Sequence, residues 1–350
     1  MKILVVGAGD YEIHDPAIAK GFSELGHEVR SFAWHEFFKP VNFFKKMQRK
    51  FVLGPAVRNI NKTLIKSAED FSPNLVFIYR NIYIHPRTIC VLKKRGAVVF
   101  SYNNDDPFSK KYSYFNRQLS RVYLKSVHAC DHNFVFRHKN IQDFNKIGVH
   151  NVSILRAFFI KERAFCLPMI DKEEKEVDVI FVGHYELDGR DEYVNSLIDQ
   201  KIKFELFGFG WKASKYYLRI RDYLGYDFSV HLHSKDYNEA LNSGKIALVF
   251  LSKLNNDTYT TRCFEIPAVK TMMLCERTED MQSMFTEDHE AAYFSSPQEC
   301  LEKVNFYLEN NRYKAIAENG YQRLMQDGHE AKDRCREILD KYSQICGARK

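Results

Sequence analysis

Short apolar runs alternate along the chain with amphipathic segments long enough to form helices. In the first half, runs of strand length cover residues 2–9, 27–34, 74–79, 97–102, 133–136 and 152–155. A helix predicted from Pro16 to Leu25, closed by Gly26, separates the first two runs. Strand, helix and strand in this order are typical of a parallel sheet covered by helices.

The pattern restarts after the charged run 171–176, which we interpret as an exposed linker. Further strands are predicted at 177–182, 203–207, 246–251 and 272–274, and helices at 191–200, 297–308, 312–325 and 331–345. We therefore expect an α/β protein with two Rossmann-like doubly wound domains, residues 1–170 and 171–350. They should face each other across a cleft, with ligands at the carboxyl ends of the strands.

Composition fits this expectation, with 45% hydrophobic and 28% charged residues in a chain of 350. The eight cysteines form no Cys-x-x-Cys pair, which favours reduced thiols and a cytoplasmic protein. We find no signal peptide and no apolar run of membrane-spanning length. A net charge of +7 is too small to indicate a nucleic-acid partner.

The positive charge is concentrated between residues 36 and 66, where Glu36 is the only acid. Apolar side chains recur there at helical spacing, at Phe37, Val41, Phe44, Met47 and Phe51. The interpretation we favour is a helix that packs its aromatic side on the domain core and leaves its lysines in water. The alternative is a peripheral contact with the anionic inner face of a membrane, or with an acidic acceptor.

The turn after the first strand contains Gly7 and Gly9 but has Glu12 where a dinucleotide site needs a third glycine. Acids in this turn would repel a pyrophosphate, so an NAD-dependent oxidoreductase is disfavoured. We assign this loop to an acceptor instead. The candidate acceptor-binding residues are Gly9, Asp10, His14 and Asp15.

A second polar loop, residues 103–107, follows the strand 97–102. Asn103 and Asn104 are candidates for binding acceptor hydroxyls, and Asp105 or Asp106 is a candidate catalytic base. The alternative is a turn closed by side-chain hydrogen bonds of Asn and Asp, without chemistry.

Two loops of the second half are candidates for donor binding. Gly183 allows a ligand close to the backbone, His184 follows it, and Arg190 opens the next helix as a phosphate partner. In the loop containing Gly208 and Gly210, Trp211 either stacks on a base or belongs to the core.

The most informative stretch is residues 258–276. Thr260 or Thr261 is expected to cap a helix whose first turn holds Arg262 and Glu265. Free N–H groups and Arg262 suit a phosphate, and Glu265 suits sugar hydroxyls. An ordinary surface pair between Arg262 and Glu265 is the alternative. With Arg190, Arg262 would form a pair of guanidinium groups that binds a pyrophosphate.

These motifs together resemble the spore-maturation-type (CgeB-like) branch of the GT-B glycosyltransferases. The likeness is carried mainly by the runs 178–183 with Arg190, 206–211, 261–268, 316–320 and 329–339, and by 102–107 in the first half. In retaining GT-B enzymes two carboxylates eight residues apart mark the donor site. Asp257 and Glu265 match these positions here, with Glu265 on the ribose, and Lys270 stands where glycine is usual.

The resemblance implies a metal-independent glycosyltransferase that needs no cofactor. It would take a nucleotide-diphosphate sugar, such as a UDP-sugar, and transfer the sugar to a glycan, a lipid-linked saccharide or a protein. We expect a retaining transfer, and a base at Asp105 or Asp106 if the transfer inverts. The alternatives are a nucleotide-sugar epimerase of the same fold and a non-catalytic carbohydrate-binding or coat-assembly protein. No Asp-x-Asp metal motif is present.

Overall fold

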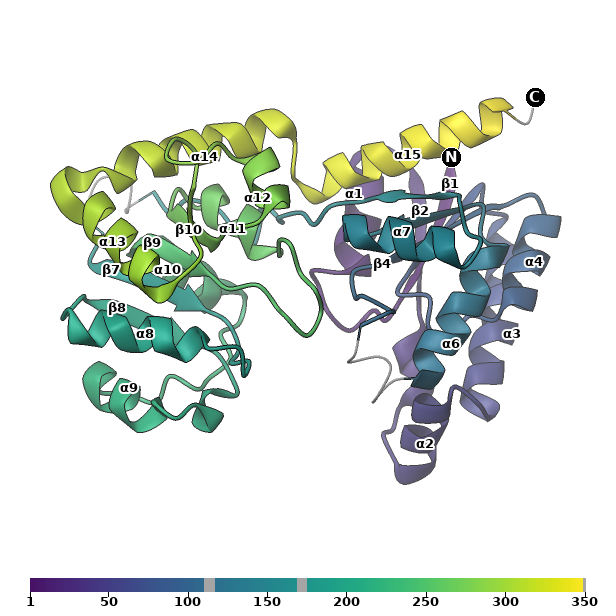
Figure 1. Cartoon of the computed structure of the whole chain (residues 1–350). Coiled ribbons are helices and arrows are strands. Elements are labelled where there is room, and N and C mark those ends of the chain that lie inside the picture. The colour runs from purple at the N-terminus through teal and green to yellow at the C-terminus, as the bar shows by residue number, and fades with distance from the viewer. Residues whose placement is uncertain (110–116, 169–174, 349–350) are drawn as a thin grey trace. The chain divides into compact units, whose positions relative to one another are not determined.

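The computed structural model describes residues 1–109, 117–168 and 175–348. The chain forms two compact units. Unit 1 contains Met1–Ala157, Leu254–Asn256 and Glu330–Lys350, and unit 2 contains Phe158–Lys253 and Asp257–His329. Each unit is built on one parallel sheet, so the predicted fold class of two α/β domains is confirmed (Figure 1).

Unit 1 has a six-stranded sheet in the order β2-β1-β3-β4-β5-β6. All of its strand pairs are parallel. The strands are β1 (Lys2–Gly7), β2 (Glu28–Ala33), β3 (Leu75–Tyr79), β4 (Val98–Asn103), β5 (His132–Val135) and β6 (Val152–Ile154). The central strands β1, β3 and β4 are buried almost throughout, as a sheet covered on both faces requires. Each strand therefore coincides with one of the predicted apolar runs.

The α-helices of unit 1 connect these strands. They are α1 (Asp15–Glu24), α2 (Phe43–Phe51), α3 (Pro55–Phe71), α4 (Pro86–Lys94), α6 (Arg117–Ser126), α7 (His138–Lys146) and α15 (Ala331–Ala348), with 3-10 turns η1 (Trp34–Phe38) and η2 (Val127–Ala129). Residues of α3, α4 and the strands form an apolar cluster in the core of this unit.

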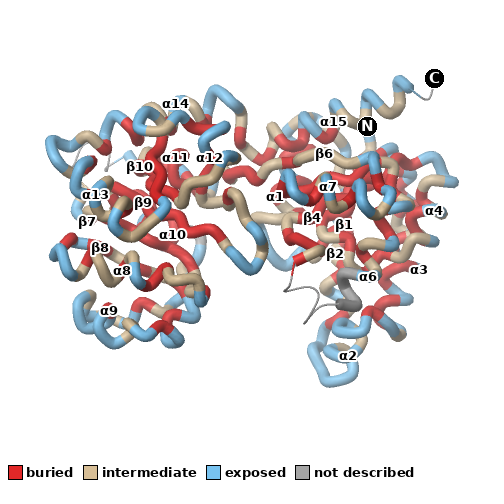
Figure 2. The backbone as a smooth tube through the Cα atoms, viewed as in Figure 1, coloured by how far each residue is buried: buried red, intermediate tan, exposed pale blue. Residues whose placement is uncertain are grey.

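Helix α2 departs from the interpretation that we favoured for the basic stretch. None of its residues is buried (Figure 2). Its aromatic side chains lie in solvent. Phe43 is 69% exposed and Phe44 is 74% exposed. Of the five apolar positions predicted at helical spacing, Phe37, in η1, is the one that packs on the core cluster, where it stacks against Phe32 at 5.7 Å. The prediction that the aromatic side of this helix covers the domain core is therefore wrong.

Unit 2 has a five-stranded sheet in the order β11-β10-β9-β7-β8, again parallel. The strands are β7 (Val177–Val182), β8 (Phe204–Phe207), β9 (Gly244–Val249), β10 (Met272–Glu276) and β11 (Ala292–Phe294). The pattern predicted all of these strands except β11, which has three residues. A strand this short carries no periodicity of its own.

Helices cover the sheet of unit 2. They are α8 (Arg190–Asp199), α9 (Tyr217–Leu224), α10 (Ser234–Ser243), α11 (Arg262–Ala268), α12 (Glu279–Met284), α13 (Pro297–Leu308) and α14 (Tyr313–Asp327), with 3-10 turns η3 (Trp211–Ala213) and η4 (Glu309–Asn311). Residues of α8, α9, α13 and α14 form an apolar cluster with the strands of this sheet.

The division into units differs from the predicted one at residue 170, a boundary that lies outside the described residues. Unit 2 already begins at Phe158, whereas α15, at the end of the chain, belongs to unit 1. Its buried side chains Ala331, Cys335 and Ile338 share one helix face. Cys335 packs on α1, where its thiol lies 3.3 Å from the carbonyl oxygen of Ile18. The last helix therefore completes the first unit, because α1 offers the apolar surface that α15 covers.

Of the predicted linker, residues 171–174 lie outside the described part of the chain. Lys175 is held, since its ammonium donates to Thr271 Oγ1 at 2.6 Å and to the carbonyl of Lys270 at 3.1 Å. Within the described ranges, no helix combines the length and the apolar character needed to cross a membrane.

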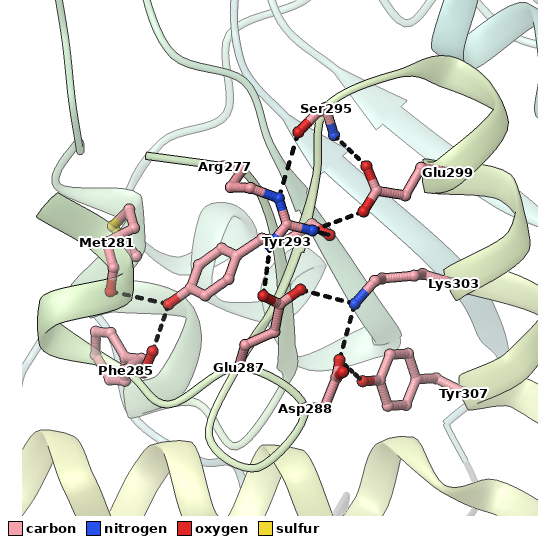
Figure 3. A network of polar contacts seen from close by, with 10 residues as sticks. All are labelled: Arg277, Met281, Phe285, Glu287, Asp288, Tyr293, Ser295, Glu299, Lys303 and Tyr307. Carbon is pink, nitrogen blue, oxygen red and sulfur yellow. Dashed lines mark hydrogen bonds and ion pairs between the residues drawn. The ribbon is translucent and has the colours of Figure 1, made fainter. Parts of the chain in front are cut away.

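A network of charged side chains joins the segment after β10 to β11 and α13 in unit 2 (Figure 3). Arg277 pairs with Glu287 and, at 2.6 Å, with Glu299. Lys303 reaches Glu287 at 2.9 Å and Asp288 at 2.8 Å. Burial acts to raise the pKa of Glu287, but hydrogen bonds from Arg277 and Lys303 outweigh it and lower the pKa. The network is therefore strongest when its carboxylates are ionised.

Replacing Arg277 should destabilise unit 2 in a pH-dependent way. We expect Arg277→Met to lower the free energy of unfolding by about 1–2 kcal/mol at neutral pH. Because the pKa of Glu287 is lowered in the folded state, this contribution is complete above the ordinary glutamate value of about 4.3 and is lost as the pH falls below it. Urea denaturation at several pH values measures both quantities.

The matched control is Arg219→Met, which removes an arginine paired with Asp199 at an exposed site. Its effect should stay within about 0.5 kcal/mol at every pH. Equal losses for Arg277→Met at neutral and acid pH would contradict the role assigned to the network.

Candidate functional site

The strand order of unit 2 reverses between β7 and β9, and the candidate site lies at the carboxyl ends of these two strands. The chain leaves β7 towards β8 on one side, and β9 lies on the other side of β7. In doubly wound sheets, ligands bind where the strand order reverses in this way. The loop 183–189 follows β7 and the loop 250–261 follows β9, so Arg190 and Arg262 begin the helices after two adjacent strands.

The loop after β7 crosses the loop after β8 at van der Waals distance, through two glycines. A Cβ atom on Gly208 would lie 2.0 Å from the carbonyl oxygen of Gly183, which no side chain can occupy. A Cβ atom on Gly183 would lie 2.7 Å from the Phe181 ring and 3.3 Å from Nη1 of Arg262. The structure thus brings Gly183, Gly208 and Arg262 together, as the sequence predicted for a donor site.

Trp211 supports this crossing and does not present its ring to a ligand. It is fully buried, and its indole Nε1 donates to the carbonyl oxygen of Gly183 at 2.9 Å. The predicted stacking of Trp211 on a base is therefore wrong, because the ring belongs to the core. Gly210, at φ 86°, turns the chain just before it.

The aromatic side chain that does reach the surface of this loop is Phe209, which is 59% exposed. It stacks on His184, with ring centroids 5.3 Å apart and planes 16° apart. His184 was predicted from the sequence, whereas Phe209 was not. Its position between two glycines was the available signal, since glycines leave the intervening side chain free of neighbours.

Arg190 is not available to a phosphate. Its side chain is 2% exposed, and its guanidinium contacts Asp188 at 2.6 and 2.9 Å and the carbonyl oxygen of His184 at 2.7 Å. The predicted pair of phosphate-binding guanidinium groups is therefore not found, because Arg190 is neutralised by a carboxylate of its own loop. Its role is to hold the loop after β7 in shape.

Glu186 is a second carboxylate in this loop and was not among the residues predicted from the sequence. It accepts from His184 at 2.9 Å and from Ser252, in the loop after β9, at 3.0 Å. Burial acts to raise the pKa of Glu186, but the hydrogen bonds from His184 and Ser252 and the charge of Arg190 lower it. Glu186 thus stays ionised and joins the loops that follow β7 and β9.

Arg262 has a different environment from Arg190. Its guanidinium lies over the Phe181 ring, 6.0 Å from the centroid. Its Nε atom is buried without a hydrogen-bond partner. Among the described residues none forms an ion pair or hydrogen bond with this side chain. A cation without a counter-charge beside Gly183 is suited to an anionic ligand.

Glu265 lies one turn further along α11, and it does not pair with Arg262. It is buried, accepting from the hydroxyl of Tyr237 at 2.5 Å and from Nε of Arg163 at 3.4 Å. Burial, followed by the charge of Glu265, raises the pKa of Tyr237 well above its usual value, so its hydroxyl stays protonated and donates. The alternative of an Arg262–Glu265 surface pair is thus wrong. The partners Arg163 and Tyr237 had no signal in the sequence, because they lie far from Glu265 along the chain.

The start of α11 differs from the predicted cap. Thr261 is the N-cap residue, but its side chain makes no capping hydrogen bond. The predicted side-chain cap is therefore not formed. Asp257 stands before it, half-buried, with its backbone N–H donating to the carbonyl of Ser252 at 3.0 Å. Lys270 has φ 52°, a left-handed conformation in which glycine is the usual residue.

In unit 1, the turn after β1 is organised around Asp15. Its carboxylate accepts from the backbone of Gly9 at 3.1 Å, and a Cβ atom on Gly7 would lie 2.1 Å from its Cγ. Burial raises the pKa of Asp15 against the effect of that hydrogen bond. Burial, and then the charge of Arg80, lowers the pKa of His14 to about 3. Asp15 is buried and His14 is partly buried, whereas Asp10 is exposed.

The loop after β4 has the hydrogen bonds of a turn. Asn103 Oδ1 accepts from the backbone of Asp105 at 3.1 Å, and Asp106 Oδ1 accepts from Phe108 at 2.9 Å. Arg137 donates to the carbonyl of Asn104 at 2.9 Å. The alternative interpretation of residues 103–107 as a closed turn is therefore confirmed.

Asp106 is fully buried with both carboxylate oxygens occupied. Besides Phe108, its partners are Asn140 and Asn256, each at 2.8 Å, and Lys139 at 3.4 Å. The prediction of Asp106 as a catalytic base is wrong, because no lone pair is left for a substrate proton. Asp105 forms an ion pair with Arg80.

In the part of the chain that the structure describes, no three His, Cys, Asp or Glu side chains gather as a metal site would require.

The glycine crossing gives a test of this geometry. We expect Gly208→Ala to destabilise the protein by about 3 kcal/mol, because its Cβ meets the Gly183 carbonyl. Gly225→Ala is the control, since Gly225 has φ 77° with open space around it. It should cost about 1 kcal/mol from backbone strain alone. Equal losses in urea denaturation would show that the close approach is not present.

Known proteins resemble this chain in sequence over part of its length and in structure over nearly all of it. Residues 190–340 match the sequence profile of a family described as glycosyl transferase-like. No curated protein matches the chain in sequence.

Solved structures match over nearly the whole chain. Sucrose-phosphate synthase from Thermosynechococcus elongatus has a TM-score of 0.71 at 8% identity, covering 99% of this chain and 100% of that one. HepE from Anabaena, in complex with UDP and glucose, has 0.66 at 11%, covering 98% and 100%. The UDP-GlcNAc 2-epimerase from Neisseria meningitidis, bound to UDP-GlcNAc, has 0.53 at 13%, covering 98% and 100%. The spore-maturation-type branch stays a prediction, and the chain has the GT-B glycosyltransferase fold.

Proposed function

We propose that this protein is a glycosyltransferase that uses a UDP-sugar as donor. The observation that carries the proposal is Arg262, a guanidinium without a counter-charge, held beside the Gly183 turn at the carboxyl ends of β7 and β9. A cation without a counter-charge, in a glycine-containing turn at the carboxyl ends of parallel strands, is an arrangement that suits phosphate groups.

The comparisons support the donor class. The matching family is glycosyl transferase-like, and its profile spans Arg190 to residue 340, which includes the donor-site candidates Arg262 and Glu265. HepE, with the same fold, was solved with UDP-glucose and with UDP. We transfer this ligand class to the loops of unit 2.

Each residue of the site has a proposed role. Arg262 binds the diphosphate and stabilises the charge that develops on the departing nucleotide, which is the main energetic demand of the reaction. Glu265 accepts hydrogen bonds from the ribose hydroxyls. Tyr237 and Arg163 orient its carboxylate and occupy two of its roughly four acceptor positions, so the others remain for the ribose. Phe209 and His184 offer a flat surface on which the base stacks.

Gly208, Gly210, Trp211 and Arg190 act indirectly, by fixing the loops that present these groups. Asp257 is proposed to contact the donor sugar and Thr261 the phosphates, as the resemblance implies. Neutralisation by arginine takes the part that a metal has in other transferases, so we propose a metal-independent reaction without a cofactor.

We propose that the turns after β1 and β4 of unit 1 bind the acceptor, a saccharide, a lipid-linked saccharide or a protein. We propose a retaining transfer, in which no acceptor base is needed. Asp106 has no free lone pair, and Asp105 is paired with Arg80. His14, with its pKa lowered to about 3, is a weak base. None of these side chains is equipped to remove a proton from an acceptor hydroxyl.

An epimerase is the second candidate, because the UDP-GlcNAc 2-epimerase of Neisseria meningitidis shares the fold. The two activities differ in their need for an acceptor. An epimerase converts the donor alone, whereas a transferase releases UDP when an acceptor is present.

Binding of UDP tests the donor site. We expect UDP to raise the unfolding temperature of the wild type, and Arg262→Ala to weaken UDP binding about 10-fold to 100-fold, since a charge-assisted hydrogen bond contributes about 1.5–3 kcal/mol. Isothermal titration calorimetry measures the affinity. Arg219→Ala, which removes a surface guanidinium of the same unit, should bind UDP as the wild type does. A wild type that binds no nucleotide diphosphate would refute the proposal.

The reaction itself is tested with a panel of UDP-sugars, each incubated with and without a mixture of saccharide acceptors. We expect UDP release to depend on an acceptor and to fall at least about 100-fold in Arg262→Ala, because the lost contact is strongest in the transition state. Chromatography of the products detects both outcomes. Conversion of a UDP-sugar to its epimer without acceptor would establish the second candidate instead.

A further inference from the structure

The helix α2, with its flanking residues, forms a projecting tip on unit 1, which we call the α2 tip (residues 41–53). Helices α2 and α3 form a hairpin that ends in this tip (Figure 1). Its exposed apolar side chains are Val41, Phe43, Phe44, Met47, Phe51 and Leu53. Exposed apolar groups that are contiguous in this way mark an interaction surface.

The apolar side chains of α2 lie on one face of the helix. Phe43, Met47 and Phe51 follow each other at intervals of four residues, and Phe44 lies three residues before Met47. Residues with these spacings are neighbours on a helix surface. This face is therefore a continuous apolar strip that no part of the described chain buries.

The remainder of the tip is firmly attached to unit 1, so the strip is not exposed through local disorder. Asn42 caps α2 by accepting from the backbone of Lys45 at 2.9 Å. Gln48 accepts from the backbone of Ala56, in α3, at 2.8 Å. Val52 is 1% exposed and belongs to the core cluster of the unit. The hairpin thus presents its apolar strip on a rigid support.

The charges around the strip have one sign. Lys46 and Lys50 are exposed and form no ion pair within the described chain. Lys45 and Arg49 lie on the same helix. Glu36 is the only acid between residues 36 and 66, and Lys39 pairs with it at 2.8 Å. A partner for this surface must therefore be apolar where it meets the phenylalanines and negatively charged beside them.

An anionic bilayer has this chemistry. Phenylalanine side chains enter the boundary between headgroups and acyl chains, while lysines beside them contact lipid phosphates. A protein partner fits less well, because lysine is depleted from protein–protein interfaces. We propose that the α2 tip docks unit 1 on the surface of an anionic membrane, with Phe43 and Phe44 inserted and Lys46 and Lys50 on the phosphates.

Flotation with lipid vesicles tests the proposal on the full chain. The wild type should float with vesicles of phosphatidylcholine containing about one third phosphatidylglycerol, and much less with phosphatidylcholine alone. Lys46→Gln with Lys50→Gln should lower partitioning onto the anionic vesicles about 10-fold to 30-fold. Phe43→Ser with Phe44→Ser should lower it at least about tenfold.

Matched controls separate the tip from a general effect of charge or apolar surface. Lys62→Gln with Lys66→Gln removes the same charge from exposed positions of α3, and Leu218→Ser removes an exposed apolar side chain from α9. Both should float as the wild type does. Thermal unfolding of every variant verifies that the fold is retained, which is expected because all of the changed residues are exposed.

A second measurement does not depend on loss of binding. Trp34 and Trp211 are both buried, so Phe44→Trp adds an exposed reporter that keeps the aromatic character of the strip. Its fluorescence should shift to shorter wavelength with anionic vesicles and be quenched by brominated acyl chains. The proposal is overturned if the wild type does not float with anionic vesicles or if the tip variants float as the controls do. It is also overturned if the Phe44→Trp emission does not change, or if sedimentation shows that the tip mediates association between copies of this chain instead.

Discussion

The candidate donor site depends on two backbone segments that approach more closely than any side chain permits. The carbonyl of Gly183 occupies the space that a Cβ atom on residue 208 would need, and the indole of Trp211 fixes that carbonyl by a hydrogen bond. Because Gly183 also lacks a side chain, the guanidinium of Arg262 can lie beside it. A steric constraint in the backbone thus determines where a positive charge is exposed, and the proposed chemistry follows from that placement.

Pattern in the sequence was sufficient for the fold and for the strand ends at which we place the candidate site. Apolar runs of strand length and the glycines after them identified the sheets and their carboxyl edges. A strand that is buried on both faces needs apolar residues at almost every position, and such a run is visible in the sequence. The pattern could not tell which side chains on those edges are free. Arg190 and Arg262 occupy equivalent places, yet a carboxylate two residues away neutralises Arg190. Asp106 likewise looked reactive, but Asn140 and Asn256, distant along the chain, occupy its oxygens.

The same limit explains the errors at Trp211 and in α2. Whether an aromatic side chain is buried depends on which surfaces the fold brings to it, and periodicity records only that a helix has an apolar side. In α2 that side meets no neighbour, whereas the ring of Trp211 is enclosed by Phe181, Tyr185 and Phe228. The glycine positions predicted the loops of the candidate site better than the aromatic positions did. A glycine indicates that the backbone at that point leaves no space for a side chain.

The path of the chain through the two units has a consequence for biosynthesis. Helix α15 covers α1, yet more than three hundred residues separate Ile18 from Cys335, which meet at 3.3 Å. A ribosome therefore exposes the first sheet long before the helix that seals it has been made. Unit 1 cannot be completed until all of unit 2 has been synthesised, and no single cut in the polypeptide yields both units intact.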